Sequence, residues 1–461
     1  MSIKKIISFI ILITIIILIV FGIFYIINNR NGGGDTPEDA PNNEFPTSGS
    51  SGNSGFSEGD DNRESNIVLL PGDVLNESGE VVKKREIGLR QISTEPSAGL
   101  SVDQREITIE ETREILSEDS DDIEYVKEEI QIQEYLSYFI QKKDGHIILD
   151  SDNTKEQTKI SNNTIPQTYL GYVSKDFSIL QYLDSSKEVI QSFAGIFVDR
   201  EIVEETEDEN GGVIEETLIE RVFEGSVLPS NLKSLVLSPD NISLSFIKDT
   251  DTGSDVITMS SIDFSDVTLV HRSQLRDISV QWGNSDELYI TSKPDSRSEG
   301  FIKRINTNTG LEENILSGIF GLTIKPGYSN THIISSLQNP NEGSSPLLIF
   351  NEEDNSFTNT GIYSLPEKCV WSKENEEVVY CLGQKLKPLS NLPQDWYLGV
   401  TDFADLLFKI NTDTNNITNL SYLYGDILRI FDGIKPQLSP DEKRLIFIDK
   451  NDDTPWILTL D

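Results

Sequence analysis

The sequence contains few of the residues on which catalytic and metal sites are usually built. Among 461 residues there are two cysteines, three histidines and two methionines. Gly-rich phosphate loops, closely spaced histidine pairs and Cys-x-x-Cys motifs are absent. None of the three histidines, His146, His271 and His332, flanks a cysteine, so a zinc-type site is not expected. We therefore predict a protein that is not an enzyme and that holds no cofactor or metal ion.

Positive charge is also scarce. The chain has 38 Lys and Arg residues against 77 Asp and Glu residues, a formal net charge of −39 at pH 7. Such a surface repels nucleic acid and anionic membrane surfaces, so we expect neither as a partner. The excess of carboxylates is compatible with a solvated acidic exterior, and also with attraction of divalent cations or basic partners.

The two cysteines, Cys369 and Cys381, flank a short segment with Asn375 at its midpoint. In a β-hairpin that turns at Asn375 they would face each other across two antiparallel strands, within disulfide range. Outside the cytoplasm such a pair should oxidise, so the sequence predicts a disulfide there.

One hydrophobic run is long enough to cross a membrane. Residues 6–27 carry no charge and, at about 1.5 Å per residue, would form a helix about 33 Å long. Lys4 and Lys5 precede the run, which predicts an uncleaved signal anchor with a cytoplasmic N-terminus and an extracytoplasmic body. We therefore divide the chain into a cytoplasmic stub with the transmembrane anchor (1–30), a disordered linker rich in Gly, Ser, Asn and Pro (31–66) and a folded body (67–461).

The folded body is built on a repeat. Five times an apolar run is followed by a tight polar turn and a second run rich in β-branched residues. Equivalent turn positions lie 45, 42, 47 and 67 residues apart, and they are Ser238, Gly283, Lys325, Ser372 and Ser439. Periods of this length with several short strands each are typical of propeller blades.

Counting outward from these turns predicts an all-β, seven-bladed β-propeller, although six or eight blades are also possible. The predicted blades are 100–166, 169–231, 232–273, 275–318, 319–365, 366–427 and 428–461, with strands at 123–126, 136–140 and 146–149 in the first. The last blade is one strand short, and a strand predicted at 89–93 stands alone before the first blade. We expect that strand to pair into the last blade and close the ring, because closure removes exposed sheet edges.

Residues 438–460 contain the fullest copy of the repeat: a Leu-Ser-Pro-Asp turn, an aliphatic strand, an Asp-rich turn and a third strand, with Glu442 where Gly is usual. This pattern resembles the TolB-type propeller repeat. The chain as a whole also resembles a group of uncharacterised, membrane-anchored propeller proteins of candidate-phylum bacteria, through segments 89–96, 145–146, 161–166, 181–184 and 365–372. The resemblance implies a fold and a topology, and it implies no activity. TolB's role in a periplasmic complex is not carried over, because its separate N-terminal domain has no counterpart here.

Two insertions interrupt the repeat. In the sixth blade, residues 383–403 carry an aromatic cluster in which Trp396, Tyr397 and Asp395 are candidate binding residues, because Trp and Tyr are common at binding hot spots. The alternative is that Trp396 and Tyr397 fold back over the propeller face as a plug. In the second blade, 200–207 and 213–221 alternate apolar and charged residues, which predicts a projecting acidic β-hairpin. By strand order, the two insertions should lie on opposite faces of the disc.

These features predict a membrane-anchored, extracytoplasmic propeller that acts as a protein- or peptide-binding or scaffolding module at the cell envelope. Its partner would be an unknown extracytoplasmic protein or peptide, and it would contact the cell membrane through residues 6–27. The alternative is a ligand- or cation-binding sensor, or an enzyme, that uses an acidic central channel. A channel closed over by Trp396 favours the first function, and an open funnel lined by carboxylates favours the second.

Overall fold

The computed structural model describes residues 73–75, 81–84, 88–116, 123–207, 213–329, 331–339, 343–421 and 429–460. The chain divides into two units, Met1–Val68 and Leu69–Asp461, and every described residue belongs to the second unit. The predicted anchor and linker therefore lie outside the described residues. In the part of the chain that is described, no helix is long and apolar enough to span a membrane.

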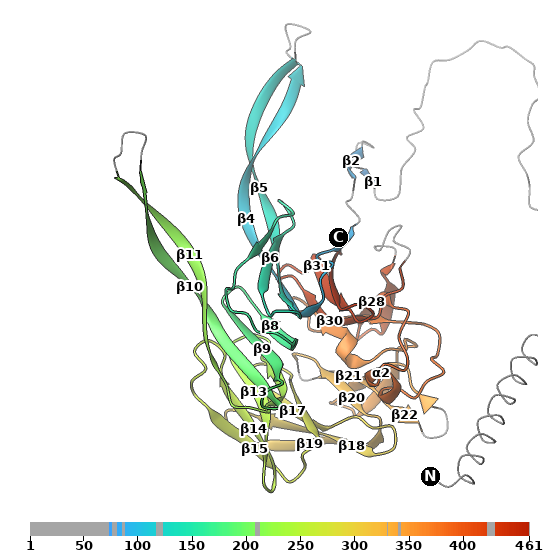
Figure 1. The fold of residues 1–461 in the computed structure, drawn as a ribbon. Coiled ribbons are helices and arrows are strands. Elements are labelled where there is room, and N and C mark those ends of the chain that lie inside the picture. The colour runs from blue at the N-terminus through green and yellow to red at the C-terminus, as the bar shows by residue number, and fades with distance from the viewer. Residues whose placement is uncertain are drawn as a thin grey trace, which may run out of the picture. The chain divides into compact units, whose positions relative to one another are not determined.

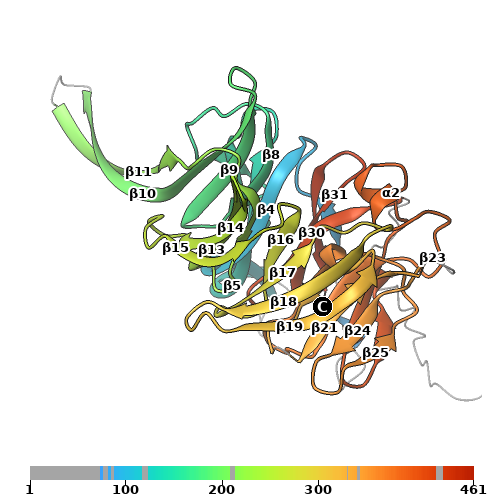
Figure 2. The same cartoon turned by 90° about the horizontal axis from the view of Figure 1, so that it is seen from below.

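The second unit contains seven four-stranded antiparallel sheets, which are the blades of a propeller (Figures 1 and 2). The predicted all-β fold with seven blades is confirmed. The first three blades are β4–β7 (Ser97–Leu116, Ile123–Gln141, Ile147–Ser151 and Gln157–Lys159), β8–β11 (Thr168–Val173, Phe177–Asp184, Val189–Glu207 and Val213–Val227) and β12–β15 (Lys233–Leu237, Ser243–Thr250, Gly253–Ser260 and Thr268–Ser273).

The fourth to sixth blades follow the same meander. They are β16–β19 (Ile278–Trp282, Glu287–Ser292, Glu299–Asn306 and Glu312–Phe320), β20, β21, β24 and β25 (Thr323–Pro326, His332–Ser336, Leu348–Asn351 and Ser356–Asn359) and β26–β29 (Cys369–Trp371, Val378–Gly383, Leu406–Asn411 and Asn416–Asn419). Small additional elements are β1 (Asp73–Leu75), β2 (Val81–Lys84), β22 (Gln338–Asn339), β23 (Gly343–Ser344), η1 (Pro366–Lys368) and α2 (Gln394–Tyr397).

The seventh blade joins the two ends of the described chain. It consists of β30 (Gly433–Leu438), β31 (Arg444–Asp449), β32 (Thr454–Thr459) and, at its outer edge, β3 (Leu89–Gln91). In the pairing of β3 with β32, Leu89 lies opposite Leu458. The edge of β32 is thereby covered by a strand from the other end of the body.

Seven hydrophobic clusters fill the seven spaces between neighbouring blades. The cluster between the seventh and first blades contains Leu100, Phe139, Ile446 and Ile448, so the ring is closed by side-chain packing as well. Because each sheet is covered on both faces, its strands can be apolar without alternation. Strand β31, for example, is buried at every position after Arg444.

Two hairpins extend beyond the blades on the same face of the disc (Figure 1). Strands β4 and β5 pair along their whole length, and residues 105–116 and 123–134, beyond the part paired with β6, are called the first arm. Strands β10 and β11 pair in the same way, and residues 197–207 and 213–223, beyond the part paired with β9, are called the second arm. The hairpin predicted in the second blade is confirmed. The first arm was not predicted, since its strands were expected to be short.

The order of the strands within a blade determines on which face of the disc each connection between strands lies. The first arm extends a turn between first and second strands, and the second arm a turn between third and fourth strands, so both lie on one face, called the arm face. The insertion between β27 and β28 lies at the other end of its strands. That opposite side is called the insert face.

The two cysteines are joined in the structure. Cys369 on β26 lies opposite Cys381 on β27, with an S–S distance of 2.07 Å. Both side chains are buried in the cluster between the fifth and sixth blades. Because the disulfide closes a short loop, it is expected to stabilise this hairpin by about 2–3 kcal/mol.

Candidate functional site

The three predicted binding residues lie on or beside α2, on the insert face, and they have different environments. Trp396 is 5% exposed, and its indole N–H donates to Oδ2 of Asp432 at 2.8 Å. Asp395 accepts the backbone N–H of Asn391 at 2.7 Å. Tyr397 is 48% exposed. The burial of Trp396 corresponds to the plug alternative, which leaves Tyr397 as the aromatic residue of the three that a partner could contact.

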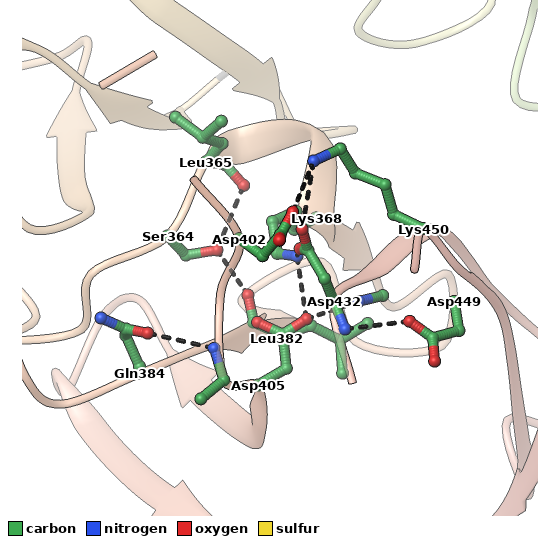
Figure 3. Close-up of polar contacts among 12 residues, drawn as sticks. Ser364, Leu365, Lys368, Leu382, Gln384, Asp402, Asp405, Asp432, Asp449 and Lys450 are labelled. Atoms are coloured by element: carbon green, nitrogen blue, oxygen red, sulfur yellow. Dashed lines mark hydrogen bonds and ion pairs between the residues drawn. The ribbon is translucent and has the colours of Figure 1, made fainter. Parts of the chain in front are cut away.

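A fully buried lysine, Lys368, lies 5.4 Å from the ring centre of Trp396, and Figure 3 shows its polar contacts. Lys368 of η1 is 0% exposed, and its Nζ lies 2.8 Å from Oδ2 of Asp405 and also contacts Oδ1 of Asp432. The second oxygen of Asp432 accepts the Trp396 N–H and lies 3.4 Å from Nζ of Lys450. The side chains of Lys368, Asp405 and Asp432 are closed to solvent. We therefore interpret the network as the contact that fixes the insertion between β27 and β28 to the propeller.

Asp405 is the least satisfied member of this network. Its Oδ2 accepts the backbone N–H of Gly433 at 2.6 Å, but its Oδ1 has no hydrogen-bond partner among the described residues. Burial raises the pKa of Asp405 to about 6, although the charge of Lys368 opposes the shift. The folded protein therefore binds a proton at Asp405 in a pH range where the unfolded chain has lost it.

Replacing Asp405 with asparagine should change how stability depends on pH. A carboxyl group whose pKa is raised on folding contributes stability below its unfolded pKa and loses that contribution as pH rises through its folded pKa. Between about pH 4 and pH 6 the wild type should thus lose up to about 3 kcal/mol relative to Asp405→Asn. Urea unfolding of both proteins across this range measures the difference, and parallel pH profiles would contradict the assignment.

The first strands of the blades surround a central channel that contains two cavities. The arm-side cavity, of about 670 Å³, is lined by turns on the arm face, including those at 174–177, 237–242 and 436–442. The insert-side cavity, of about 480 Å³, is lined by first strands and by Glu367 and Tyr397. Lys325 lines both cavities. Their volumes are within the range typical of small-molecule sites.

The channel does not have the uniformly acidic wall that the alternative function assumed. The arm-side cavity is lined by four carboxylates and three lysines, and they are Asp103, Asp176, Asp240, Glu442, Lys175, Lys325 and Lys373. The charged residues of the insert-side cavity are Lys325, Lys435 and Glu367. The expectation was wrong for this second cavity, because its lining holds two lysines and a single carboxylate. Among the described residues, no group of His, Cys, Asp and Glu could hold a metal ion.

The first arm has two chemically different faces. Ile107 lies opposite Ile132 and Ile109 opposite Ile130, and because side chains alternate along a strand, all four share one face. These isoleucines are partly exposed and belong to none of the hydrophobic clusters of the described residues. The other face carries exposed polar residues, and they are Glu106, Thr108, Glu110, Glu129, Gln131 and Gln133. The arm is therefore an amphipathic two-stranded ribbon.

The second arm is secured at its base by aromatic packing. The rings of Phe197 and Phe223 lie 5.1 Å apart, and the Arg221 guanidinium lies 5.3 Å from the Phe197 ring. Arg200 pairs with Glu224 across the two strands. Phe223 also belongs to the cluster between the first and second blades, so the base of the second arm is packed into the ring.

The candidate functional residues that sequence reasoning missed are the four isoleucines of the first arm and the channel lysines. The alternation of Ile with Thr, Gln or Glu at 105–111 and 127–133 was a usable signal for the arm, because the second arm was predicted from the same kind of pattern. A Gly-x-Ser-x-Gly pentapeptide occurs at 55–59, within the predicted linker and outside the described residues. A nucleophile elbow needs a strand before the serine and a helix after it, which a linker does not supply.

No family model matches the chain, and no curated protein is similar to it. Three solved propellers illustrate its similarity to known structures. TolB from Acinetobacter baumannii is 7% identical with a TM-score of 0.37, over 71% of this chain and 76% of that one. An oligogalacturonate lyase from Vibrio parahaemolyticus is 10% identical with a TM-score of 0.42, over 78% of this chain and 99% of that one.

The third is the propeller domain of the Trilobed protease from Pyrococcus furiosus, 9% identical with a TM-score of 0.41, over 71% of this chain and 92% of that one. The similarity to all three is too low to support any functional argument, so the propeller assignment rests on the seven sheets themselves. The resemblance to membrane-anchored propellers of candidate-phylum bacteria stays a prediction.

Proposed function

We propose that this protein is a binding module that docks a protein or peptide partner on the apolar face of its first arm. The observation that supports the proposal is the strip of four isoleucines, Ile107, Ile109, Ile130 and Ile132, on a ribbon that projects from the disc. A two-stranded ribbon is marginally stable in water by itself, and an apolar face without a covering layer is what a partner would bury.

The charge of the arm specifies the chemistry of the partner. Glu111 and Glu128 lie opposite each other on the same face as the isoleucines, and both are exposed. A partner that covers the strip would place its own rim next to these carboxylates, so it should carry apolar side chains flanked by Lys or Arg. An added strand from the partner could also pair with the free edge of β4 or β5 along the arm.

The location of this module is part of the proposal. The uncharged run at 6–27 and the preceding lysines support an anchor in the cell membrane, and the Gly- and Ser-rich stretch after it supports a linker that holds the propeller outside the cytoplasm. A tethered propeller with a projecting arm would act as a scaffold at the cell envelope. Tyr397 and Asp395 are candidate contacts for a second partner on the insert face.

Substituting the four isoleucines with threonine should weaken partner binding while leaving the blades folded. Threonine keeps the β-branched shape that favours strands but removes most of the apolar surface. Proximity labelling from the full-length protein in cells would identify a partner, and direct titration of that purified partner would then measure its affinity. We expect the fourfold variant to bind at least about tenfold more weakly.

The matched control changes the opposite face of the same ribbon. A Thr108→Ala, Gln131→Ala variant alters two exposed residues that lie opposite each other and leaves the isoleucine strip intact. Its affinity should equal that of the wild type. If the partner binds the isoleucine variant and the control equally well, the first arm is not the docking surface.

A further inference from the structure

The insert-side cavity of the channel has a charge opposite to that of the protein. Its charged lining residues are two lysines, Lys325 and Lys435, and one carboxylate, Glu367, in a chain whose net charge is −39. The Glu367 carboxylate already accepts a hydrogen bond from the hydroxyl of Tyr397. Glu367 is therefore the one carboxylate of this lining, and it already has a partner, while the charge of Asp453, outside the lining, acts on Lys435.

Lys435 lies at an irregularity of β30, and this irregularity places it in the wall of the cavity. The register of β30 against β31 shifts between Ile434 and Gln437, and Lys435 has a φ of 52°, in the left-handed region that favours glycine. Its ammonium group donates to the carbonyl of Ala98 at 2.7 Å, and among the described residues no carboxylate pairs with it. The bulge thus places a cation beside the channel at some cost in backbone energy.

Lys325 is placed by β20, the first strand of the fifth blade, and has even fewer contacts. In the described part of the chain, its Nζ makes no ion pair or hydrogen bond, although Glu367 is near enough to act on its charge. Burial lowers the pKa of Lys325, and burial together with the charge of Lys142 lowers the pKa of Lys435 to about 8. At pH 7 Lys435 is still mostly protonated, and a bound anion would relieve the cost of desolvating both cations.

We propose that the insert-side cavity binds a small molecule through an oxyanion, either a carboxylate or a phosphate, by means of the ammonium groups of Lys325 and Lys435. A cavity of about 480 Å³ suits a small ligand. Its wall also contains neutral polar side chains, among them Ser234, Ser279 and Gln437, each of which makes a hydrogen bond within the protein. This site does not depend on the docking function proposed for the first arm, which lies on the other face of the disc.

Isothermal titration of the full-length protein in detergent with phosphate and, separately, with citrate tests the site. Sodium chloride at equal ionic strength is the reference, because salt alone screens the acidic surface. At least one anion should bind saturably, and Lys325→Met and Lys435→Met should each weaken it tenfold or more. The control is Lys143→Met, since Lys143 is an exposed lysine outside the cavity, and its affinity should not change. Binding of phosphate alone or of citrate alone identifies which oxyanion the cavity prefers.

Chemical labelling of the wild type tests the same site without any variant. The aldehyde of pyridoxal 5′-phosphate condenses with a deprotonated lysine amine and releases water, and borohydride reduces the resulting imine to a stable amine. Peptide mapping should find Lys325 or Lys435 labelled ahead of exposed lysines, with the label reduced several-fold by the anion that binds. The proposal is overturned if neither anion binds above the chloride reference, or if both methionine variants and the labelling pattern show no preference for these lysines.

Discussion

Replacing Lys368 with methionine is expected to lower the free energy of unfolding by about 3–5 kcal/mol, because breaking a buried ion pair leaves an uncompensated charge. Lys368 is 0% exposed and contacts both Asp405 and Asp432, whose side chains are also fully buried. Methionine fills a similar volume, so the loss would come from charge rather than from a cavity. Urea unfolding at pH 7 followed by tryptophan fluorescence measures the change.

A double-mutant cycle distinguishes lost charge from lost packing at Lys368. Adding Asp405→Asn to Lys368→Met removes one of the two carboxylates that the lysine had neutralised, so the double variant should regain at least about 1 kcal/mol. Lys409→Met is the control, since Lys409 also lies over an aromatic ring, that of Tyr380 at 5.5 Å, but is exposed. It should change stability by less than about 0.5 kcal/mol. Additive effects of the two substitutions would show that Lys368 acts through packing alone.

The sequence was sufficient to predict the blades because each blade repeats one local pattern. An aliphatic strand, a polar turn and a second aliphatic strand recur around Ser238 and Ser439, and in both turns the Ser hydroxyl donates to the Asp two residues later. Such a pattern involves only residues that are close together in the sequence, so it can be recognised without knowing the fold. The closure by 89–93 could be expected for a different reason, because a ring with a missing strand would leave an edge unpaired.

The buried ionic network and the channel cations could not be predicted in this way. Lys368, Asp405 and Asp432 come from three separate connections, and a lysine is almost never fully buried unless paired, so hydropathy places it on the surface. The position of Lys435 in the cavity wall depends on a bulge in β30. The sequence does not predict that bulge, since a lysine with positive φ is rare. Trp396 is likewise buried by packing against residues such as Leu365, and its N–H is satisfied by Asp432, which is distant in sequence.

Because the two proposed sites differ in charge, we expect them to bind ligands of opposite charge. Carboxylates are exposed along the first arm at Glu106, Glu110 and Glu129, where water screens their repulsion. In the insert-side cavity, Lys325 and Lys435 outnumber Glu367 and are partly removed from water. A basic protein partner on the arm and a small oxyanion in the channel could therefore bind independently. The net charge of the chain alone would have indicated the first of these ligands and missed the second.

Removing the side chains that close the ring should destabilise the whole propeller. Leu89 and Ile92 are 7% and 4% exposed, and they pack into the two clusters on either side of the seventh blade. A buried Leu or Ile changed to Ala typically costs about 2–5 kcal/mol, so the Leu89→Ala, Ile92→Ala variant should lose roughly 4–10 kcal/mol. That is a large fraction of the roughly 5–15 kcal/mol that stabilises a typical protein. Glu95→Ala, just beyond this strand and exposed, should have little effect.

The shape of the unfolding transition then shows whether the ring unfolds as one unit. If the other six blades need the seventh blade and its two interfaces in order to stay folded, the variant should unfold in a single transition. That transition should occur at a lower urea concentration with an unchanged m-value. Leu458 lies opposite Leu89, so Leu458→Ala combined with Leu89→Ala should cost less than the sum of the two single changes. A separate early transition with a reduced m-value would instead mean that the seventh blade opens alone, and that closure protects only the edge of β32 rather than the whole ring.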